Sequence, residues 1–141
     1  MSQAILPMKR IFLYILVSLI SSSSFTQETM PSEIVQKNLD AYNARDLSEF
    51  MKSFSYSIVL YSFEKKEPIA EGKEALRALY QKLFEASPEL HSTILHRAVI
   101  GNKVIDHESI TGRKGSSVPV EMVMIYEVSE EHIVRMTVVK E

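Results

Sequence analysis

Residues 91–112 read "HSTILHRAVIGNKVIDHESITG", and this stretch predicts a β-hairpin. Two runs rich in β-branched and other apolar residues, 91–100 and 103–111, flank the pair Gly101-Asn102. A Gly-Asn pair between two such runs is typical of a tight two-residue turn, because both residues tolerate positive φ. We therefore expect two antiparallel strands joined without a loop.

The turn also fixes which residues face each other across the hairpin. Counting outward from it, Arg97 faces Asp106 and His96 faces His107. Side chains alternate between the two faces of a strand, so the two histidines share one face. Arg97, Asp106 and Glu108 share the other face. The hairpin thus has two chemically different sides.

The rest of the chain predicts one α+β domain. The order of elements is helix, helix, strand, helix and then four antiparallel strands, which favours helices packed on one face of a curved sheet. Apolar periodicity and capping residues predict helices that begin at Ser32, Asp46 and Gly72. Strands are expected at 57–63, 90–100, 103–111, 118–128 and 132–140, and the charged run "EKKEP" is expected as a turn.

The N-terminus has the pattern of a secretory signal peptide. Lys9-Arg10 precede the apolar run 11–20, and a serine cluster follows it. The run is about half of the roughly 20 residues that a bilayer span requires, so the mature form should have no membrane span. We expect a signal peptide at 1–27, translated from Met1 or Met8, and a mature domain at 28–141 that is periplasmic or extracellular.

Composition excludes several classes of function. The 141 residues contain no cysteine, so disulfides and thiolate chemistry are absent. Loss of 1–27 removes two of the 16 basic residues and none of the 18 acidic ones, and 14 − 18 leaves a net charge of −4. A surface of that sign does not favour nucleic acid. No glycine-rich phosphate loop or other local cofactor motif occurs, so no cofactor is predicted.

Three hypotheses remain for His96 and His107. They line a pocket as a hydrogen-bonded pair, act as an acid/base pair, or fill the core. A metal site would need a third ligand from another strand, and no residue supplies one, so no metal is predicted. For Arg97 and Asp106 the pattern favours a solvated or interface-facing ion pair.

Three segments carry a family resemblance. They are "EIVQKNLDAYNARDLSEFMKSFSYSIVLYSF", the helix "EGKEALRALYQKLF", and the hairpin with the later strand "IYEV". Over residues 32–140 the chain resembles the nuclear-transport-factor-2-like superfamily, and within it the SnoaL-like, steroid-isomerase-like proteins. The resemblance implies a cone of curved sheet around three helices, an internal hydrophobic pocket and a homodimer packed through the sheet.

The resemblance also implies which hairpin face lines the pocket. In the ketosteroid isomerase branch, pocket-lining aromatics occupy positions that match His107 and Thr111. By that analogy His96 and His107 look inward, and the charged face looks outward. The expected pocket lining is Asn38, Leu60, Ser62, Tyr80, Ser109, Met122, Met124, Tyr126 and Met136, together with the histidines.

The same comparison argues against steroid isomerisation. That branch uses a tyrosine, a carboxylate base and a protonated aspartic acid. Their positions fall on Asn38, Ser62 and Met124 here, and neither serine nor methionine can accept a proton near neutral pH.

The sequence thus predicts a secreted protein with a pocket for a small hydrophobic ligand. The alternative is an isomerase, cyclase or hydrolase of a hydrophobic carbonyl compound, with His107 and His96 as acid and base. A weaker alternative is a protein-interaction module that uses the face of Arg97, Asp106 and Glu108.

Overall fold

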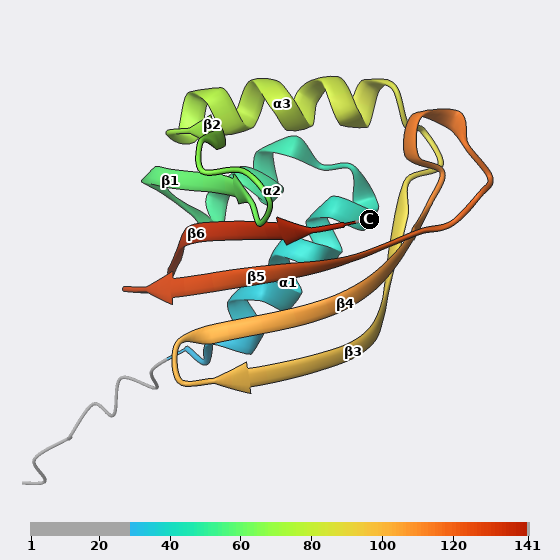
Figure 1. The fold of residues 1–141 in the computed structure, drawn as a ribbon. Helices are drawn as coiled ribbons and strands as arrows, with labels where there is room; N and C mark the ends of the chain where they lie inside the picture. Colours follow the sequence, from blue (N-terminus) through green and yellow to red (C-terminus); the bar gives the residue numbers. More distant parts are fainter. Residues whose placement is uncertain (1–28, 141) are drawn as a thin grey trace, which may run out of the picture.

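The computed structural model describes residues 29–140, and the expected signal peptide lies outside them. Figure 1 shows a curved sheet with helices on its concave side and along its upper edge. The helices are α1 (Pro31–Ala44), α2 (Leu47–Lys52), α3 (Lys73–Glu85) and a short 3-10 turn, η1 (Arg113–Gly115). The strands are β1 (Phe54–Ser62), β2 (Pro68–Glu71), β3 (His91–Ile100), β4 (Lys103–Thr111), β5 (Val120–Ser129) and β6 (His132–Val139).

The six strands form one sheet in the order β2-β1-β6-β5-β4-β3. The predicted α+β architecture, with a curved sheet around helices, is confirmed. The last four strands pair antiparallel as predicted, and two further features of the sheet were not predicted. The β1 and β6 strands pair in parallel, because β1 enters the sheet beside the last strand of the chain. Residues Pro68–Glu71 form a short edge strand on β1 that was not predicted, and it includes Pro68 from the end of the predicted turn "EKKEP".

Local signals explain the helices. Pro31 stands at the first turn of α1, where its missing N–H costs nothing, and Arg45 ends that helix in the left-handed region at φ 53°. The Asp46 side chain then accepts a 3.0 Å hydrogen bond from the Glu49 backbone N–H, which caps α2 as the sequence predicts. Gly72 is the residue before α3. No helix between residues 29 and 140 is both long and apolar enough to cross a membrane.

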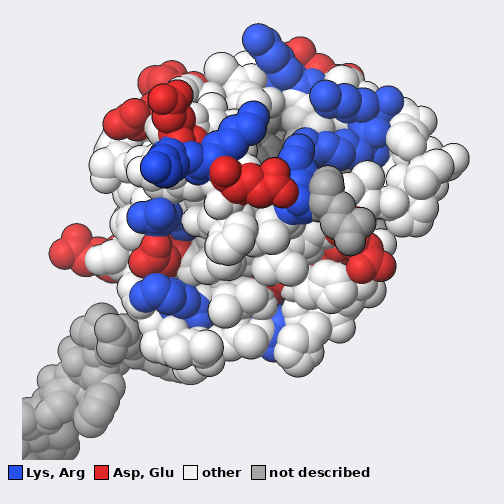
Figure 2. Space-filling view, viewed as in Figure 1, with Lys and Arg blue, Asp and Glu red and all other residues white. Residues whose placement is uncertain are grey.

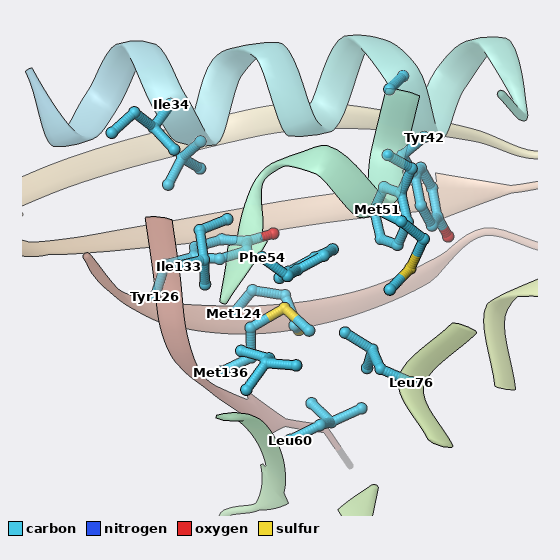
Figure 3. Packing of buried hydrophobic residues seen from close by; sticks show 14 of the residues in the cluster. Ile34, Tyr42, Met51, Phe54, Leu60, Leu76, Met124, Tyr126, Ile133 and Met136 are labelled. Atoms are coloured by element: carbon cyan, nitrogen blue, oxygen red, sulfur yellow. The ribbon is translucent and has the colours of Figure 1, made fainter. Parts of the chain in front are cut away.

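The core lies between the helices and the concave face of the sheet (Figure 3). An aromatic cluster joins the three helices to β1, with Phe50 at its centre: its ring centroid lies 4.5 Å from that of Tyr80 and 5.0 Å from that of Phe54. Met122, Met124 and Met136 cover the sheet side of the core. Methionine side chains adapt to irregular spaces, which suits a wall where curved strands meet helices.

The loop after β4 is held close to the end of α3. Gly112 has φ 72°, and a Cβ there would lie 2.1 Å from the Glu89 carbonyl oxygen, so the close approach requires glycine. The Lys114 backbone N–H donates a 2.8 Å hydrogen bond to the Oγ of Ser87, which is buried. These contacts fix η1, and with it Arg113, at the open end of the sheet.

Candidate functional site

The hairpin has the predicted register but the opposite orientation. Arg97 pairs with Asp106 and His96 with His107, as the turn predicts. The prediction that the histidines look inward and the charged residues outward is wrong: Asp106 is fully buried and Glu108 is 4% exposed. His107 and Ser109 lie on the outer face, and His96 is exposed.

The two acidic residues face inward because they share one face of β4 with apolar residues. Val104 and Ile110 occupy the same face as Asp106 and Glu108, and both are buried in the core. Burial of two large aliphatic side chains stabilises this orientation, and the alternation of the strand then carries the two acids inward. On β3 a bulge at Leu95 shifts the alternation, so the pairing passes from Ile94 to His96.

The Arg97 and Asp106 side chains form a bidentate ion pair. The Arg97 Nε donates to Asp106 Oδ1 at 2.6 Å, and Nη2 donates to Oδ2 at 2.7 Å. The remaining terminal nitrogen, Nη1, donates to Gln36 Oε1 on α1 at 2.8 Å. The Arg97 side chain is 20% exposed and that of Asp106 only 1%. The predicted pair therefore exists, but the expectation that it is solvated or interface-facing is wrong.

Glu108 lies one strand repeat further along the same face. Its Oε2 accepts a 2.8 Å hydrogen bond from Ser92 Oγ, and its Oε1 accepts a long one, 3.4 Å, from the Tyr126 hydroxyl. Burial raises the pKa of the Glu108 carboxyl to about 7, and the nearby Asp106 charge adds to this, while both hydrogen bonds and Arg97 oppose it. Glu108 can therefore gain or lose a proton near neutral pH.

Two neighbouring cavities lie at this end of the sheet, and Glu108 lines the smaller one. The inner niche has a volume of about 40 Å³, and its polar lining groups are Asn38, Tyr42, Tyr80, Glu108, Arg113 and Tyr126. The outer bowl, about 460 Å³, opens between α3, η1 and the end of β6. Both cavities are lined by Tyr80, Arg113, Met122 and Met124. These four side chains separate the bowl from the niche, which has room for about one water-sized group beside Glu108.

The tyrosines of the niche stay protonated. Burial raises the pKa of Tyr42 to about 12, partly opposed by Arg113, and burial raises the pKa of Tyr80 and Tyr126 further above the ordinary value. A neutral phenol remains a hydrogen-bond donor across the physiological pH range. The niche therefore places hydroxyl donors beside a carboxyl group that titrates.

Most of the predicted lining residues border these cavities. Asn38, Leu60, Tyr80, Met122, Met124, Tyr126 and Met136 do so, whereas Ser62 and Ser109 do not. Of the positions matched to the isomerase residues, Asn38 and Met124 therefore line the niche, and Asn38 donates a 3.1 Å hydrogen bond to the Phe50 carbonyl oxygen. Sequence reasoning missed Glu108, Tyr42 and Arg113.

The predicted catalytic histidines occupy the outer face of the sheet. The His107 Nε2 lies 2.9 Å from Glu121 Oε2 on β5, and the two side chains are 42% and 65% exposed. A catalytic role for His107 and His96 stays a prediction, but it was predicted for a pocket that they do not line. Among residues 29–140, no group of three histidine or acidic side chains could hold a metal ion.

A known family model matches most of this chain. The profile of the SnoaL-like domain matches residues 35–136, which include every strand except the ends of β6 and all three helices except the start of α1. The chain belongs to the SnoaL-like family. A search of curated proteins finds no match to this SnoaL-like chain.

Solved structures share the fold of this SnoaL-like protein. An uncharacterized cystatin fold protein from Novosphingobium aromaticivorans is 20% identical with a TM-score of 0.73, over 80% of this chain and 100% of that one. A candidate ketosteroid isomerase from Kribbella flavida is 16% identical with a TM-score of 0.68, over 79% and 77%. A candidate polyketide cyclase from Sinorhizobium meliloti is 19% identical with a TM-score of 0.65, over 75% and 93%.

Proposed function

We propose that this SnoaL-like protein binds a small hydrophobic carbonyl compound and moves a proton at it with Glu108. The observation that carries the proposal is a buried carboxyl group, with a pKa of about 7, that lines a small niche next to a larger cavity with an apolar wall. A general acid or base works best when its pKa lies near the working pH. Structural neighbours described as a cyclase, an isomerase and a hydroxylase are consistent with small-molecule chemistry on this scaffold.

The bowl supplies the binding energy in this proposal. Leu60, Leu83 and Val138, with the methionines, give it an apolar wall. The niche would admit the carbonyl oxygen of the ligand and leave the carbon skeleton in the bowl. A carbonyl oxygen there would accept hydrogen bonds from the protonated tyrosines, which is the arrangement that stabilises negative charge on an enolate.

The proposed step is a proton transfer at the carbon next to the carbonyl. Ionised Glu108 takes the proton, the C–H electron pair moves into the carbon–carbon bond, and negative charge develops on the oxygen. The protonated Glu108 then returns the proton to the same or another carbon, so no oxidant or cofactor is consumed. Asp106 does not compete for this role, because Arg97 occupies both of its oxygens.

Deuterium exchange tests the proposal without knowledge of the natural substrate. The protein is incubated in D2O with a panel of apolar ketones, and loss of the α-proton signal is followed by NMR. We expect exchange of at least one panel member well above the rate in buffer, and a loss of about 100-fold or more in Glu108→Gln. His107→Gln is the matched control, because it alters the same strand on the outer face and should exchange at the wild-type rate.

The outcomes separate catalysis from binding. Because the niche is small, a ligand that fills only the bowl would bind without reaching Glu108. Saturable binding without exchange would indicate a binding protein of the kind that the sequence also predicts. Exchange that survives in Glu108→Gln but is lost in His107→Gln would overturn the assignment of Glu108 and return the role to the histidine.

Two further features of the whole protein are proposals. We infer export of the mature domain from the N-terminal pattern, which cell fractionation and N-terminal sequencing of the secreted form would test. We also infer a homodimer through the outer face of the sheet. On that face Ile105 pairs with Ile125 and both are only partly buried, which leaves apolar surface for a second copy.

A further inference from the structure

The mouth of the bowl carries a cluster of positive charge that the proposed proton transfer does not use. Lys82 comes from α3, Arg113 and Lys114 from η1, and Lys140 follows β6. We call these four side chains the basic rim. They come from three segments that are far apart in the sequence, so their convergence is a product of the fold.

Within residues 29–140, no acidic side chain lines the bowl or pairs with the basic rim. The chain as a whole carries a net charge of −2. Figure 2 shows Lys and Arg side chains gathered on this side of the molecule with acidic side chains among them; none of those acidic residues lines the bowl.

Partly exposed apolar side chains line the same bowl. Ile69 is 44% exposed and Leu79 is 38% exposed, and both line the bowl. Exposed apolar surface next to uncompensated positive charge fits a ligand that has an apolar body and an anionic end. Arg113 lines both the bowl and the niche. Its guanidinium group is therefore close to both the anionic end of such a ligand and the part that enters the niche.

The backbone contacts of the η1 loop hold Arg113 and Lys114 beside the bowl. Lys114 has φ 51° and ψ 37°, a left-handed conformation that is unfavourable for a residue with a side chain. Its backbone N–H bonds to buried Ser87, and the close contact of Gly112 with Glu89 holds the preceding residue. The fold thus retains a strained lysine where it faces the bowl.

We propose that the ligand is a hydrophobic carboxylate, bound with its carboxylate at the basic rim and its apolar chain in the bowl. Together with the proposed function, on which this part rests, the substrate class is a hydrophobic oxo acid whose carbonyl group enters the niche. The recognition is electrostatic at the mouth and apolar inside, so a neutral analogue of the same shape binds more weakly.

A matched pair of probes tests this. The dissociation constants of 4-oxodecanoate and its primary amide, which differ in charge but hardly in shape, are measured by isothermal titration calorimetry. We expect the wild-type protein to bind the acid about tenfold more tightly than the amide at low salt. The preference should shrink in high salt, because exposed charges are screened.

Two triple variants locate the effect. Lys82→Gln, Lys114→Gln and Lys140→Gln together should remove the preference for the acid. The control combines Lys37→Gln, Lys52→Gln and Lys103→Gln, which changes the net charge equally at exposed positions that do not line the bowl, and should keep the preference. Circular dichroism melts of both variants establish that they fold.

Three results would overturn the inference: equal binding of acid and amide, no binding of the acid, or a preference that survives in the rim variant. Its failure differs from failure of the proposed function. Preferential binding of the acid without α-proton exchange would reject the chemistry and keep the ligand class. Exchange on neutral ketones with no preference for the acid would reject the ligand class alone.

Discussion

The two faces of the β3–β4 hairpin carry similar residue types but differ in what they can do. On the outer face, His107 contacts Glu121 of the neighbouring strand β5, and the two side chains are 42% and 65% exposed. On the inner face, Arg97, Asp106 and Glu108 are removed from water by α1 and the core. Charges out of water interact more strongly and shift their pKa values. One face of β4 is therefore exposed protein surface and the other is a candidate site, because only the inner charged groups are buried.

The inner ion pair offers the largest test of this contrast. Arg97→Met should lower the free energy of unfolding by about 3 kcal/mol, because it leaves the carboxylate of Asp106 buried without its partner. The matched change on the outer face of the same strand, His96→Gln, should stay within about 0.5 kcal/mol of wild type. Urea unfolding at pH 7 measures both. Equal losses in the free energy of unfolding of the two variants would contradict the conclusion that the inner ion pair contributes more to stability than the outer face does.

Glu108 provides a pH-dependent test of the inner face. Its folded pKa of about 7 lies above the ordinary 4.5, so the folded state binds the proton more tightly than the unfolded state. Stability from this group is therefore fully present below about pH 4.5 and is lost as pH rises through 7. Glutamine does not titrate, so Glu108→Gln lacks this pH-dependent loss. The free energy of unfolding of the variant minus that of wild type should therefore rise by about 2 kcal/mol between pH 5 and pH 8.

Unfolding curves at both pH values measure that difference. Glu121→Gln on the outer face serves as the control and should show little change in its stability relative to wild type over the same range. A pH dependence of Glu108→Gln that matches wild type would mean that the Glu108 carboxyl is ionised in the folded protein at pH 5.

The outer face should matter for assembly more than for folding. Ile105→Glu should weaken the proposed homodimer at least about tenfold, because it places a charge on apolar surface that the second copy would bury. Analytical ultracentrifugation over a range of concentrations measures the dissociation constant. Val99→Glu, near the end of the inner face, is the comparison and should leave association unchanged. A wild-type protein that remains a monomer at high concentration would reject the dimer.

The smallest effect is expected for His107. Its contact with Glu121 is exposed, and exposed ion pairs contribute little because water competes for both partners. His107→Gln should change the free energy of unfolding by less than about 0.5 kcal/mol. Chemical denaturation at pH 6 and pH 8 tests this, and a loss above about 1 kcal/mol would give the outer face an importance that its exposure does not suggest.

Much of the fold follows from local sequence signals. The Asp46 cap, the stripe of α3 and the Gly101-Asn102 turn each specify their element through interactions within a few residues. The short strand β2 lacked such a signal, because only Ala70 of its four residues is buried. The parallel pairing of β1 with β6 joins distant segments, and local patterns carry no information about such a partner.

The candidate site was only partly accessible from the sequence. The methionines and Tyr126 lie on the predicted inner face of β5 and border the cavities. Glu108 was missed because the hairpin was oriented by analogy with related proteins. The signal that could have corrected this was the alternation of Val104 and Ile110 with Asp106 and Glu108, since two buried aliphatic residues outweigh the cost of burying acids that find partners.

The sequence by itself therefore determined the elements, the hairpin register and the separation of the acids from the histidines, because turn chemistry and strand alternation act over a few residues. Only the tertiary structure decided which side is inside, since this depends on the total apolar area that α1 and the sheet bury together. The pKa of Glu108, the niche and the convergence of the basic rim likewise arise from segments that meet only in the folded chain.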